Sequence, residues 1–338
     1  MRKSLIPIAF PKLNSLKDGA TVIAADVGGT KSDLAFFCLE NGVPVLKKQH
    51  RYASANWTSF ADMVVHFYGS YSKPDRLAIS FAGPIKDGKA TGTNLHFGID
   101  AEAISKALGI DKVLLINDLE ANCYGLAALE ESDFKIIYNV ENREPGNAAV
   151  ISPGTGLGEG GLYWDGTAFR PFATEGGHSH FAPRYELDWE LFKYLSERYG
   201  HVSWERVVSG MGICNIFEFL RDTGRGEIPE SLKHHVSAPE ISAAAEKGSK
   251  ICQETLKLFS RYLAQEAANL ALKFKSTGGL FIGGGIMPKI WGDEYHNIFH
   301  EYFFAVGRLY PLVATVPVTL ILNQKAALLG AGYYGAYS

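Results

Sequence analysis

The pattern of apolar and polar positions predicts strands that alternate with helices. Short apolar runs rich in β-branched residues predict strands, and they lie within 22–37, 76–81, 112–116, 148–164 and 279–286. Apolar residues at helical spacing predict helices, and these cover 100–108, 119–129, 188–199 and 249–274. Strands interspersed with helices in this way indicate an α/β fold.

Two helix ends carry recognisable signals. Asp100 has the short polar side chain favoured at an N-cap, and Gly109 follows the last residue of the same predicted helix. The next run, Lys112–Ile116 (KVLLI), is apolar throughout, as expected for a parallel strand covered on both faces. Asp118, just beyond it, also occupies a position where a helix N-cap would lie.

The stretch 22–37 (VIAADVGGTKSDLAFF) reads as a strand, a tight turn and a second strand. Gly28 and Gly29 let backbone N–H groups approach an anion closely, and Thr30 adds a hydroxyl donor. Asp26 cannot itself favour an anion, so its place at the turn suits a cation such as Mg²⁺ lying between it and phosphates. Taken alone, the motif fits a plain hairpin turn equally well.

The same design occurs again further along the chain. Apolar residues lead into Gly154-Thr155-Gly156 and resume after it, and a third apolar run ends in Gly283-Gly284-Gly285. Two strand–glycine–strand units suggest two related halves that serve one ligand. Neither turn is a P-loop, because no Gly-Lys-Ser/Thr follows, and neither is a dinucleotide fingerprint, because a strand rather than a helix comes next.

The ordered set of motifs resembles the bacterial glucokinase family of the actin-like ATPase superfamily of sugar kinases. The matching segments are DVGGT at 26–30, INDLEAN at 116–122, SPGTGLG at 152–158, EGGHSHFAP at 175–183, HVSWERVVSG at 201–210, GGLFIGGGI at 278–286 and ALLGAGYY at 327–334. The resemblance implies a two-lobed actin-like ATPase (ribonuclease H-like) α/β fold with a cleft between the lobes. It further implies a small N-terminal lobe of residues 20–119 plus about 323–338, and a large C-terminal lobe of residues 120–322.

Composition narrows the class of protein. The 338 residues suffice for about two domains, and the 46% hydrophobic content supports a large core. A net charge of −3 and the lack of a basic run argue against a nucleic-acid or membrane-surface partner. No apolar run is long enough to span a membrane, and the N-terminus lacks a signal-peptide pattern. Four widely spaced cysteines predict neither a disulfide framework nor a zinc site, and we expect a cytoplasmic protein.

Asn117 and Asp118 follow a predicted parallel strand, where α/β proteins bind their ligands. By resemblance, Asp118 is the catalytic base and also contacts the sugar, while Asn117 holds a neighbouring hydroxyl. The chemistry requires such a carboxylate, because a sugar alcohol is a poor nucleophile until its proton is accepted. The structural alternative is an Asp118 that only caps a helix.

The resemblance assigns four more residues to the sugar: Asn94, Glu175, His178 and Glu205. Carboxylates accept and a neutral imidazole can donate or accept, which suits hydroxyl groups that do both. The two glycines after Glu175 argue against a helix there. Alternatives are an ordinary polar loop for Glu175 and His178, a His178–His180 metal pair, and a helix-dipole role for Glu205.

The resemblance also assigns the nucleotide site. The expected phosphate contacts are Asp26, Gly28, Gly29, Thr30, Gly154, Thr155 and Gly156, with Asp26 holding Mg²⁺ through water. Gly283, Gly284 and Gly285 are expected against the adenosine, although glycines there would equally allow close packing of a helix on the sheet.

Two positions depart from the family pattern. The family usually has arginine where this chain has Asp33, and an uncharged residue where it has Glu159. Both changes add negative charge near the expected polyanion. Either these side chains point away, or the phosphate side works differently.

The sequence therefore predicts an enzyme that uses ATP and Mg²⁺ to phosphorylate a hexose, with glucose as the expected acceptor. The alternatives are a kinase for another hexose or an N-acylated hexosamine, and a non-catalytic sugar-sensing protein on the same fold. We expect only about 20 residues before the first strand, too few for a DNA-binding helix-turn-helix. A homodimer remains open.

Overall fold

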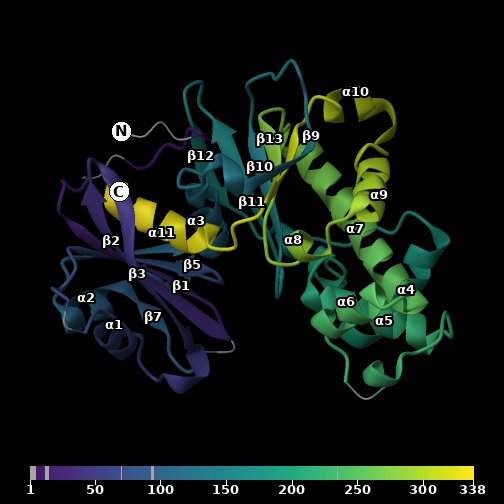
Figure 1. Ribbon diagram of the computed structural model, residues 1–338, viewed down its shortest axis with the longest axis horizontal. Helices are drawn as coiled ribbons and strands as arrows, with labels where there is room; N and C mark the ends of the chain where they lie inside the picture. The colour runs from purple at the N-terminus through teal and green to yellow at the C-terminus, as the bar shows by residue number, and fades with distance from the viewer. Residues whose placement is uncertain (1–4, 12–14, 70, 93–94, 234) are drawn as a thin grey trace. The chain divides into compact units, whose positions relative to one another are not determined.

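The computed structural model describes residues 5–11, 15–69, 71–92, 95–233 and 235–338. The chain divides into two compact units. Unit 1 consists of residues 1–133, 162–173 and 323–338, and unit 2 of residues 134–161 and 174–322. The lobe boundaries expected from the sequence stay a prediction. Figure 1 shows the elements of each unit.

Unit 1 is built on a five-stranded sheet with the order β3-β2-β1-β4-β8. Its strands are β1 Thr21–Val27, β2 Lys31–Glu40, β3 Val43–Ala53, β4 Arg76–Phe81 and β8 Lys112–Asn117. β1 runs parallel to β4 and β4 parallel to β8, whereas β2 is antiparallel to both β1 and β3. A small sheet of β5 Ile85–Lys86, β6 Lys89–Ala90 and β7 Ile99–Asp100 accompanies it.

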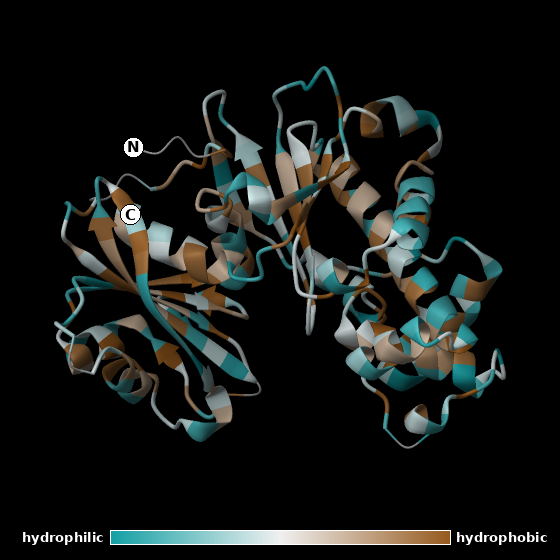
Figure 2. Cartoon of the chain, in the orientation of Figure 1, coloured by the Kyte–Doolittle hydropathy of each residue, from teal (hydrophilic) through white to brown (hydrophobic). Residues whose placement is uncertain are grey.

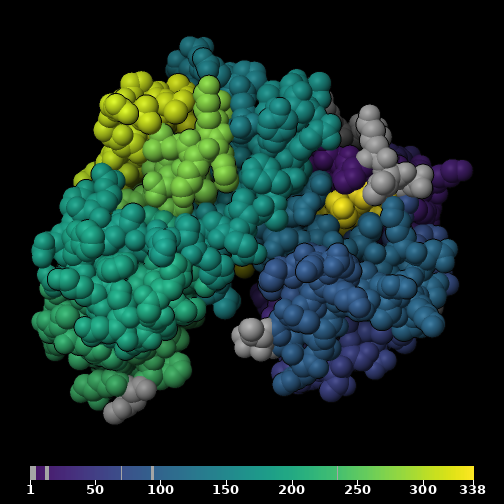
Figure 3. All heavy atoms as spheres, turned by 180° about the vertical axis from the view of Figure 1, so that it is seen from behind, coloured from purple at the N-terminus to yellow at the C-terminus, as the bar shows by residue number. Residues whose placement is uncertain are grey.

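Both faces of the central strands of the unit 1 sheet are covered, which explains the long apolar runs in β1, β4 and β8. Ile23 and Ala25 of β1 pack with the side chains of α1 Phe60–Tyr68 and α2 Ala101–Leu108. The alternate residues Val22 and Ala24 face α11 Ala326–Tyr337 on the other side. The spheres of Figure 3 show part of this C-terminal segment, in yellow, among the blue and purple atoms of unit 1.

Unit 2 contains most of a six-stranded sheet with the order β12-β11-β10-β13-β14-β9. Its strands are β9 Phe134–Tyr138, β10 Ala148–Pro153, β11 Leu157–Trp164, β12 Phe169–Ala173, β13 Gly279–Ile282 and β14 Val318–Ile321. The order β12-β11-β10-β13-β14 repeats the order β3-β2-β1-β4-β8 of unit 1, and β10, β13 and β14 are parallel as β1, β4 and β8 are. The two glycine turns therefore occupy equivalent positions, one between β1 and β2 and the other between β10 and β11.

The helices of unit 2 pack around the longest of them, α7 Lys250–Phe274. The others are α4 Glu186–Tyr199, α5 Gly210–Asp222, α6 Ala238–Glu246, α8 Met287–Ile290, α9 Asp293–Phe303 and α10 Tyr310–Val313. Figure 2 shows the strands of both sheets mostly in hydrophobic brown, with teal concentrated on loops and outer helix faces. Within the described residues, no helix combines the length and apolar character needed to cross a membrane.

The predicted ends of α2 agree with the structure, whereas two features of α3 need correction. Asp100 caps α2 by accepting from the Ala103 N–H at 3.1 Å, and Gly109 ends it in the left-handed conformation. Asp118, however, is the first residue of α3 Asp118–Gly125, and Asn117 is its N-cap. The α3 helix also stops short of Leu129, the predicted end.

Two glycines allow α3 and α11 to pack backbone against backbone. A Cβ atom at Gly330 of α11 would lie 1.8 Å from the Ala121 carbonyl oxygen, and one at Gly125 of α3 would lie 2.1 Å from the Ala326 carbonyl oxygen. Only glycine fits at either position. This contact holds the C-terminal helix against the helix that begins with Asp118.

We predict that Gly330→Ala destabilises the protein by about 3 kcal/mol, the upper end of the cost of overpacking. Thermal and denaturant unfolding measure the change. Gly292→Ala is the matched control, because Gly292 is an N-cap with no atom within 4 Å of an added Cβ. Equal stability of the two variants would show that the helix contact does not require glycine.

Candidate active site

The first glycine turn joins β1 to β2 and is held by Ser54, the first residue of the 3₁₀ turn η1 Ser54–Asn56 that follows β3. The Gly28 N–H donates to the Lys31 carbonyl at 3.0 Å, which closes the turn. Ser54 holds it from outside, because its hydroxyl donates to the Gly28 carbonyl at 2.8 Å and its N–H donates to the Thr30 carbonyl at 3.1 Å. The Thr30 side chain is exposed at the tip. The turn is therefore fixed, with its hydroxyl facing solvent.

Asp26 lies at the end of β1 in a charged neighbourhood. Its Oδ1 accepts a hydrogen bond from the Ser80 hydroxyl of β4 at 2.9 Å. Burial raises the pKa of Asp26, the Ser80 bond opposes this, and the nearby charge of Asp33 adds to the rise. Asp26 supplies one carboxylate at this strand end, which fits Mg²⁺ bound mainly through water, because this cation takes one or two carboxylates and keeps several waters.

Asp33 does not point away from Asp26. The two residues are direct partners in the β1–β2 ladder, so their side chains share one face of the sheet. Arg51 of β3 pairs with Asp33, and its Nε and Nη2 donate to the two carboxylate oxygens at 2.8 and 2.9 Å. This bidentate pair compensates the negative charge that departs from the family pattern.

The ladder of unit 1 brings the catalytic candidates to the same edge as this turn. In the parallel register, Val27 of β1 lies beside Phe81 of β4, which lies beside Asn117 of β8. The carboxyl ends of the three strands thus meet at one edge, and two strand spacings separate β1 from β8 by about 10 Å. This edge is where open α/β sheets bind ligands.

Asn117 and Asp118 differ in what they do locally. Asn117 Oδ1 accepts from the Leu119 and Glu120 N–H groups at 2.9 and 3.4 Å, and its Nδ2 donates to the Gly83 carbonyl at 3.4 Å. Asp118 Oδ1 accepts from the Leu119 N–H at 3.0 Å, and the side chain is partly exposed. Because Asn117 supplies the cap, the helix does not need Asp118 for that purpose.

The second glycine turn in unit 2 is bonded to the segment that carries Glu205. The Gly154 N–H donates to the Gly156 carbonyl at 2.8 Å, and the Gly210 N–H donates to the Gly154 carbonyl at 2.8 Å. The Leu157 N–H donates to Glu205 Oε2 at 3.0 Å. As in the first turn, the threonine at the tip, Thr155, is exposed.

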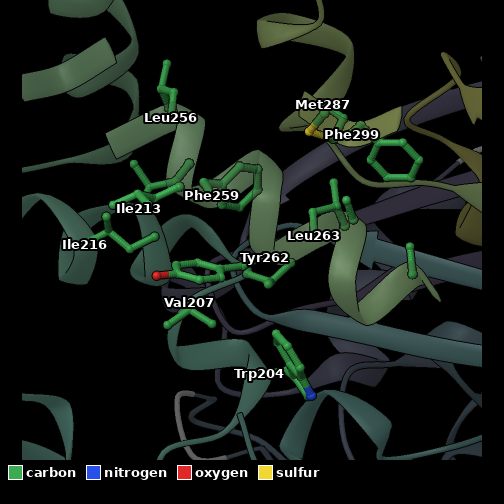
Figure 4. Close-up of a cluster of buried hydrophobic side chains, with 14 of the residues drawn as sticks. Trp204, Val207, Ile213, Ile216, Leu256, Phe259, Tyr262, Leu263, Met287 and Phe299 are labelled. Carbon is green, nitrogen blue, oxygen red and sulfur yellow. The ribbon is translucent and has the colours of Figure 1, made fainter. Parts of the chain in front are cut away.

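Glu205 lies in a short 3₁₀ turn, η4 Trp204–Arg206, anchored in the core. Trp204 and Val207 on either side of it are buried. Figure 4 shows both side chains near Tyr262 of α7, while Glu205 itself is partly exposed. Glu205 is therefore presented from a rigid base rather than from a loose loop.

Glu175 is the N-cap of a second 3₁₀ turn, η3 Gly176–His178, and His178 is its last residue. As the two glycines predict, residues 174–180 form no α-helix but only this three-residue turn, and the glycines allow close packing on β11. An added Cβ at Gly177 would lie 2.1 Å from the Leu157 carbonyl oxygen. Glu175 Oε2 and His178 Nε2 are 4.0 Å apart, and both side chains are more than half exposed.

The η3 and η4 turns lie next to each other in unit 2. The Trp204 N–H donates to the Ser179 carbonyl at 3.0 Å, and His201 Nε2 bonds the His178 carbonyl at 2.9 Å. His180 forms a bridge with Ser203, so it is on extended chain whereas His178 ends a turn. The three residues expected to hydrogen-bond sugar hydroxyl groups thus lie on adjoining segments: Glu175, His178 and Glu205.

The third glycine cluster packs tightly against the end of β10. The Gly283 N–H donates to the Ile151 carbonyl at 2.8 Å. Gly284 has a positive φ of 77°, and a Cβ there would lie 2.1 Å from the Pro153 carbonyl oxygen. Close packing requires glycine at Gly284, but its neighbour is the backbone at a strand end and not a helix, and contact of the 283–285 segment with adenosine stays a prediction.

The remaining expectations concern Asn94 and a bound metal ion. Asn94 lies outside the described residues. No group of three or more His, Cys, Asp or Glu side chains among the described residues is arranged to hold a metal ion. Sequence reasoning missed Ser54 and Ser80, which brace the first turn from neighbouring segments, because no local motif marks a residue that acts across a ladder.

Both units have a glycine turn at a strand end; unit 1 adds a carboxylate at the same sheet edge, and unit 2 adds exposed polar side chains of a kind that can bind hydroxyl groups. This combination is the one expected of a sugar kinase. A family model described as Glucokinase matches residues 23–337. The chain belongs to the glucokinase family. It is 35% identical to a glucokinase of Nostoc sp. (strain PCC 7120) over 337 residues, which cover 93% of this chain and 98% of the relative.

Solved structures agree with this assignment. The structure of a glucokinase from an Antarctic psychrotroph is similar with a TM-score of 0.80 and 30% identity, covering 94% of this chain and 99% of that one. A ROK family glucokinase from Streptomyces griseus, solved in complex with glucose and AMPPNP, has a TM-score of 0.63. At 20% identity over 93% of this chain and 98% of that chain, it supports the fold alone.

We predict that the Asp33–Arg51 pair sets the charge state of Asp26. Asp26 loses its charge as pH falls through its pKa, so Arg51→Ala, which removes a positive charge, moves that loss to higher pH. Asp33→Asn moves it to lower pH. Carbon-detected NMR titration of the Asp26 carboxyl measures both shifts. Lys47→Ala is the control, because Lys47 lies on the same strand but pairs with Glu40; equal titration curves in all variants would refute the coupling.

Proposed function

We propose that this protein transfers the γ-phosphoryl group of ATP to the 6-hydroxyl group of glucose and so forms glucose 6-phosphate. Family membership supports a sugar kinase. The single observation that carries the site assignment is the register of β1, β4 and β8, which puts Asp118 at the same sheet edge as the Asp26–Thr30 turn.

Asp118 acts as the catalytic base in this proposal. It accepts the proton of the attacking hydroxyl group as the bond to phosphorus forms, and general base catalysis by one such group is typically worth about 10²–10⁴-fold in rate. Its partly exposed carboxylate suits contact with a substrate. Asn117 Oδ1 caps α3, so the Nδ2 of Asn117 is the atom that would position a neighbouring hydroxyl group.

The glycine turns hold the phosphates. Backbone N–H groups and the hydroxyl groups of Thr30 and Thr155 donate to phosphate oxygens, in the manner of other anion-binding turns. Asp26 holds Mg²⁺ through water, and the metal ion when bound neutralises charge on the phosphates. Because phosphoryl transfer passes through a loose transition state, positioning and charge stabilisation are most of what the protein supplies.

Glu175, His178 and Glu205 bind the sugar hydroxyl groups. Their origin in adjoining 3₁₀ turns on a packed base supports this role, because a site on rigid segments rejects an epimer whose hydroxyl leaves a polar group unpaired. In its finer features, we propose the two-lobed actin-like ATPase arrangement, with a cleft that closes over the sugar and excludes water as a competing acceptor. The four free cysteines suit a reducing cytoplasm.

A donor-by-acceptor activity grid tests the function. We expect MgATP with glucose to give the highest kcat/KM among combinations of ATP, ADP or polyphosphate with glucose, mannose, fructose or N-acetylglucosamine. Chelation of the metal should abolish turnover, because the phosphate charge is then left uncompensated. Turnover of none of these acceptors with any donor would refute the proposal, and preference for another sugar would reassign the substrate.

The base role of Asp118 has its own test. Asp118→Asn should lower kcat by about 10²–10⁴-fold while glucose binding, measured by calorimetry, persists. Glu120→Gln, a substitution of the other acidic residue of α3, is the control and should keep normal turnover. An active Asp118→Asn enzyme would remove Asp118 from the base role.

A further inference from the structure

A buried pair of acidic side chains lies beneath the η3 turn in unit 2. Glu159 of β11 is 1% exposed and Glu266 of α7 is 0% exposed. Glu266 accepts from Asn269 Nδ2 at 2.7 Å and pairs with Lys273 Nζ at 3.3 Å. No donor among the described residues bonds either carboxyl oxygen of Glu159. The negative charge of the pair therefore belongs on Glu266, where it has partners.

Glu159, the other member of the pair, is favoured in its neutral, protonated form. Two ionised carboxylates have no proton to share, whereas a protonated Glu159 can donate one to Glu266. Burial, followed by the negative charge of Glu266, raises the pKa of Glu159 to about 8, although Lys273 opposes the rise. At neutral pH, Glu159 is thus mainly a carboxylic acid.

Glu159 touches the η3 turn through both its side chain and its backbone. A Cβ at Gly176 would lie 2.0 Å from Glu159 Oε2, so the carboxyl group rests directly on the glycine backbone. The Glu159 carbonyl accepts from the Thr174 hydroxyl at 2.7 Å, and the Thr174 oxygen in turn accepts from the Gly176 N–H at 3.1 Å. The residues before and within the turn are thereby fixed to β11.

We propose that Glu159 is a positioning residue for sugar binding, whose neutral carboxyl group holds the Thr174–His178 segment against β11 so that Glu175 and His178 face the sugar. This inference rests on the proposed function of those two residues. Ionisation of Glu159 would place a second negative charge beside Glu266 and against the Gly176 backbone. A buried charge without a partner is costly, and the segment can relieve it only by moving away and admitting water.

The inference has a defined pH dependence. The charged groups that face Glu159 within the described residues are Glu266 and Lys273, both on α7. As pH rises through about 8, Glu159 loses its proton, and the KM for glucose should then rise by up to about tenfold per pH unit. Turnover at saturating glucose should change little, because the sugar restores the bound geometry. Folding stability should fall as pH rises from the ordinary glutamate pKa of about 4.3 towards about 8, since the folded state retains the proton longer.

Steady-state kinetics of three variants test the proposal from neutral pH to about pH 9.5, a range that spans the ionisation of Glu159. Glu159→Gln replaces the neutral acid with a neutral isostere and should keep a low glucose KM throughout. Glu266→Gln removes the charge that raises the pKa of Glu159, so the rise in KM should begin at lower pH. Glu254→Gln, an exposed position on the same helix, should behave as the unaltered enzyme does.

Hydrogen exchange of the peptide that contains residues 174–178, corrected for intrinsic base catalysis and measured without substrate, gives a readout independent of activity. Protection should fall with rising pH in the unaltered protein and stay constant in Glu159→Gln. A glucose KM and a protection level that do not respond to alkaline pH would overturn the inference, as would the same response in Glu159→Gln. Absence of sugar turnover at any pH would instead refute the proposed function, and the exchange result would still decide the role of Glu159 in holding the turn.

Discussion

The parallel register of β1, β4 and β8 is the constraint on which the chemistry of unit 1 depends. It sets Val27, Phe81 and Asn117 side by side, so that a glycine turn and a carboxylate far apart in sequence end at one sheet edge. The register is held because both sheet faces are covered, and a slip by one residue would exchange the side chains facing α11 with those facing α1 and α2. The same strand register is therefore needed both to pack the core and to place the candidate site.

Unit 2 reaches a comparable arrangement around a single residue, Leu157. The Leu157 N–H donates to Glu205 Oε2, and the Leu157 carbonyl packs against Gly177 so closely that a side chain there would not fit. The strand that leaves the second glycine turn thus contacts both segments proposed to bind the sugar. A change at this strand would disturb phosphate and sugar contacts together, which links the two halves of the proposed reaction within one unit.

The two acidic residues that depart from the family pattern are accommodated in different ways. Asp33 forms a bidentate pair with Arg51, whose side chain is more than half exposed. Glu159 is enclosed by β11 and α7, where a second charge has no partner, and it is therefore held as the neutral acid. Neither residue therefore adds an uncompensated negative charge beside the proposed phosphate site.

The sequence alone predicts many of the strands and helices, the repeated glycine turns and the family, but not α1, α5, α6 or α9. Local signals suffice for the predicted features: alternation of apolar runs, Asp100 and Gly109 at the ends of α2, and paired glycines between strands. Only the tertiary structure decided that Asn117 rather than Asp118 caps α3, that the glycines at 176 and 177 permit a turn by packing on β11, and that Arg51 neutralises Asp33. The last two depend on contacts between residues distant along the chain, and a sequence pattern does not specify which strands become neighbours. The cap is a choice between adjacent residues, and the long-range bond from Asn117 Nδ2 to the Gly83 carbonyl accompanies it.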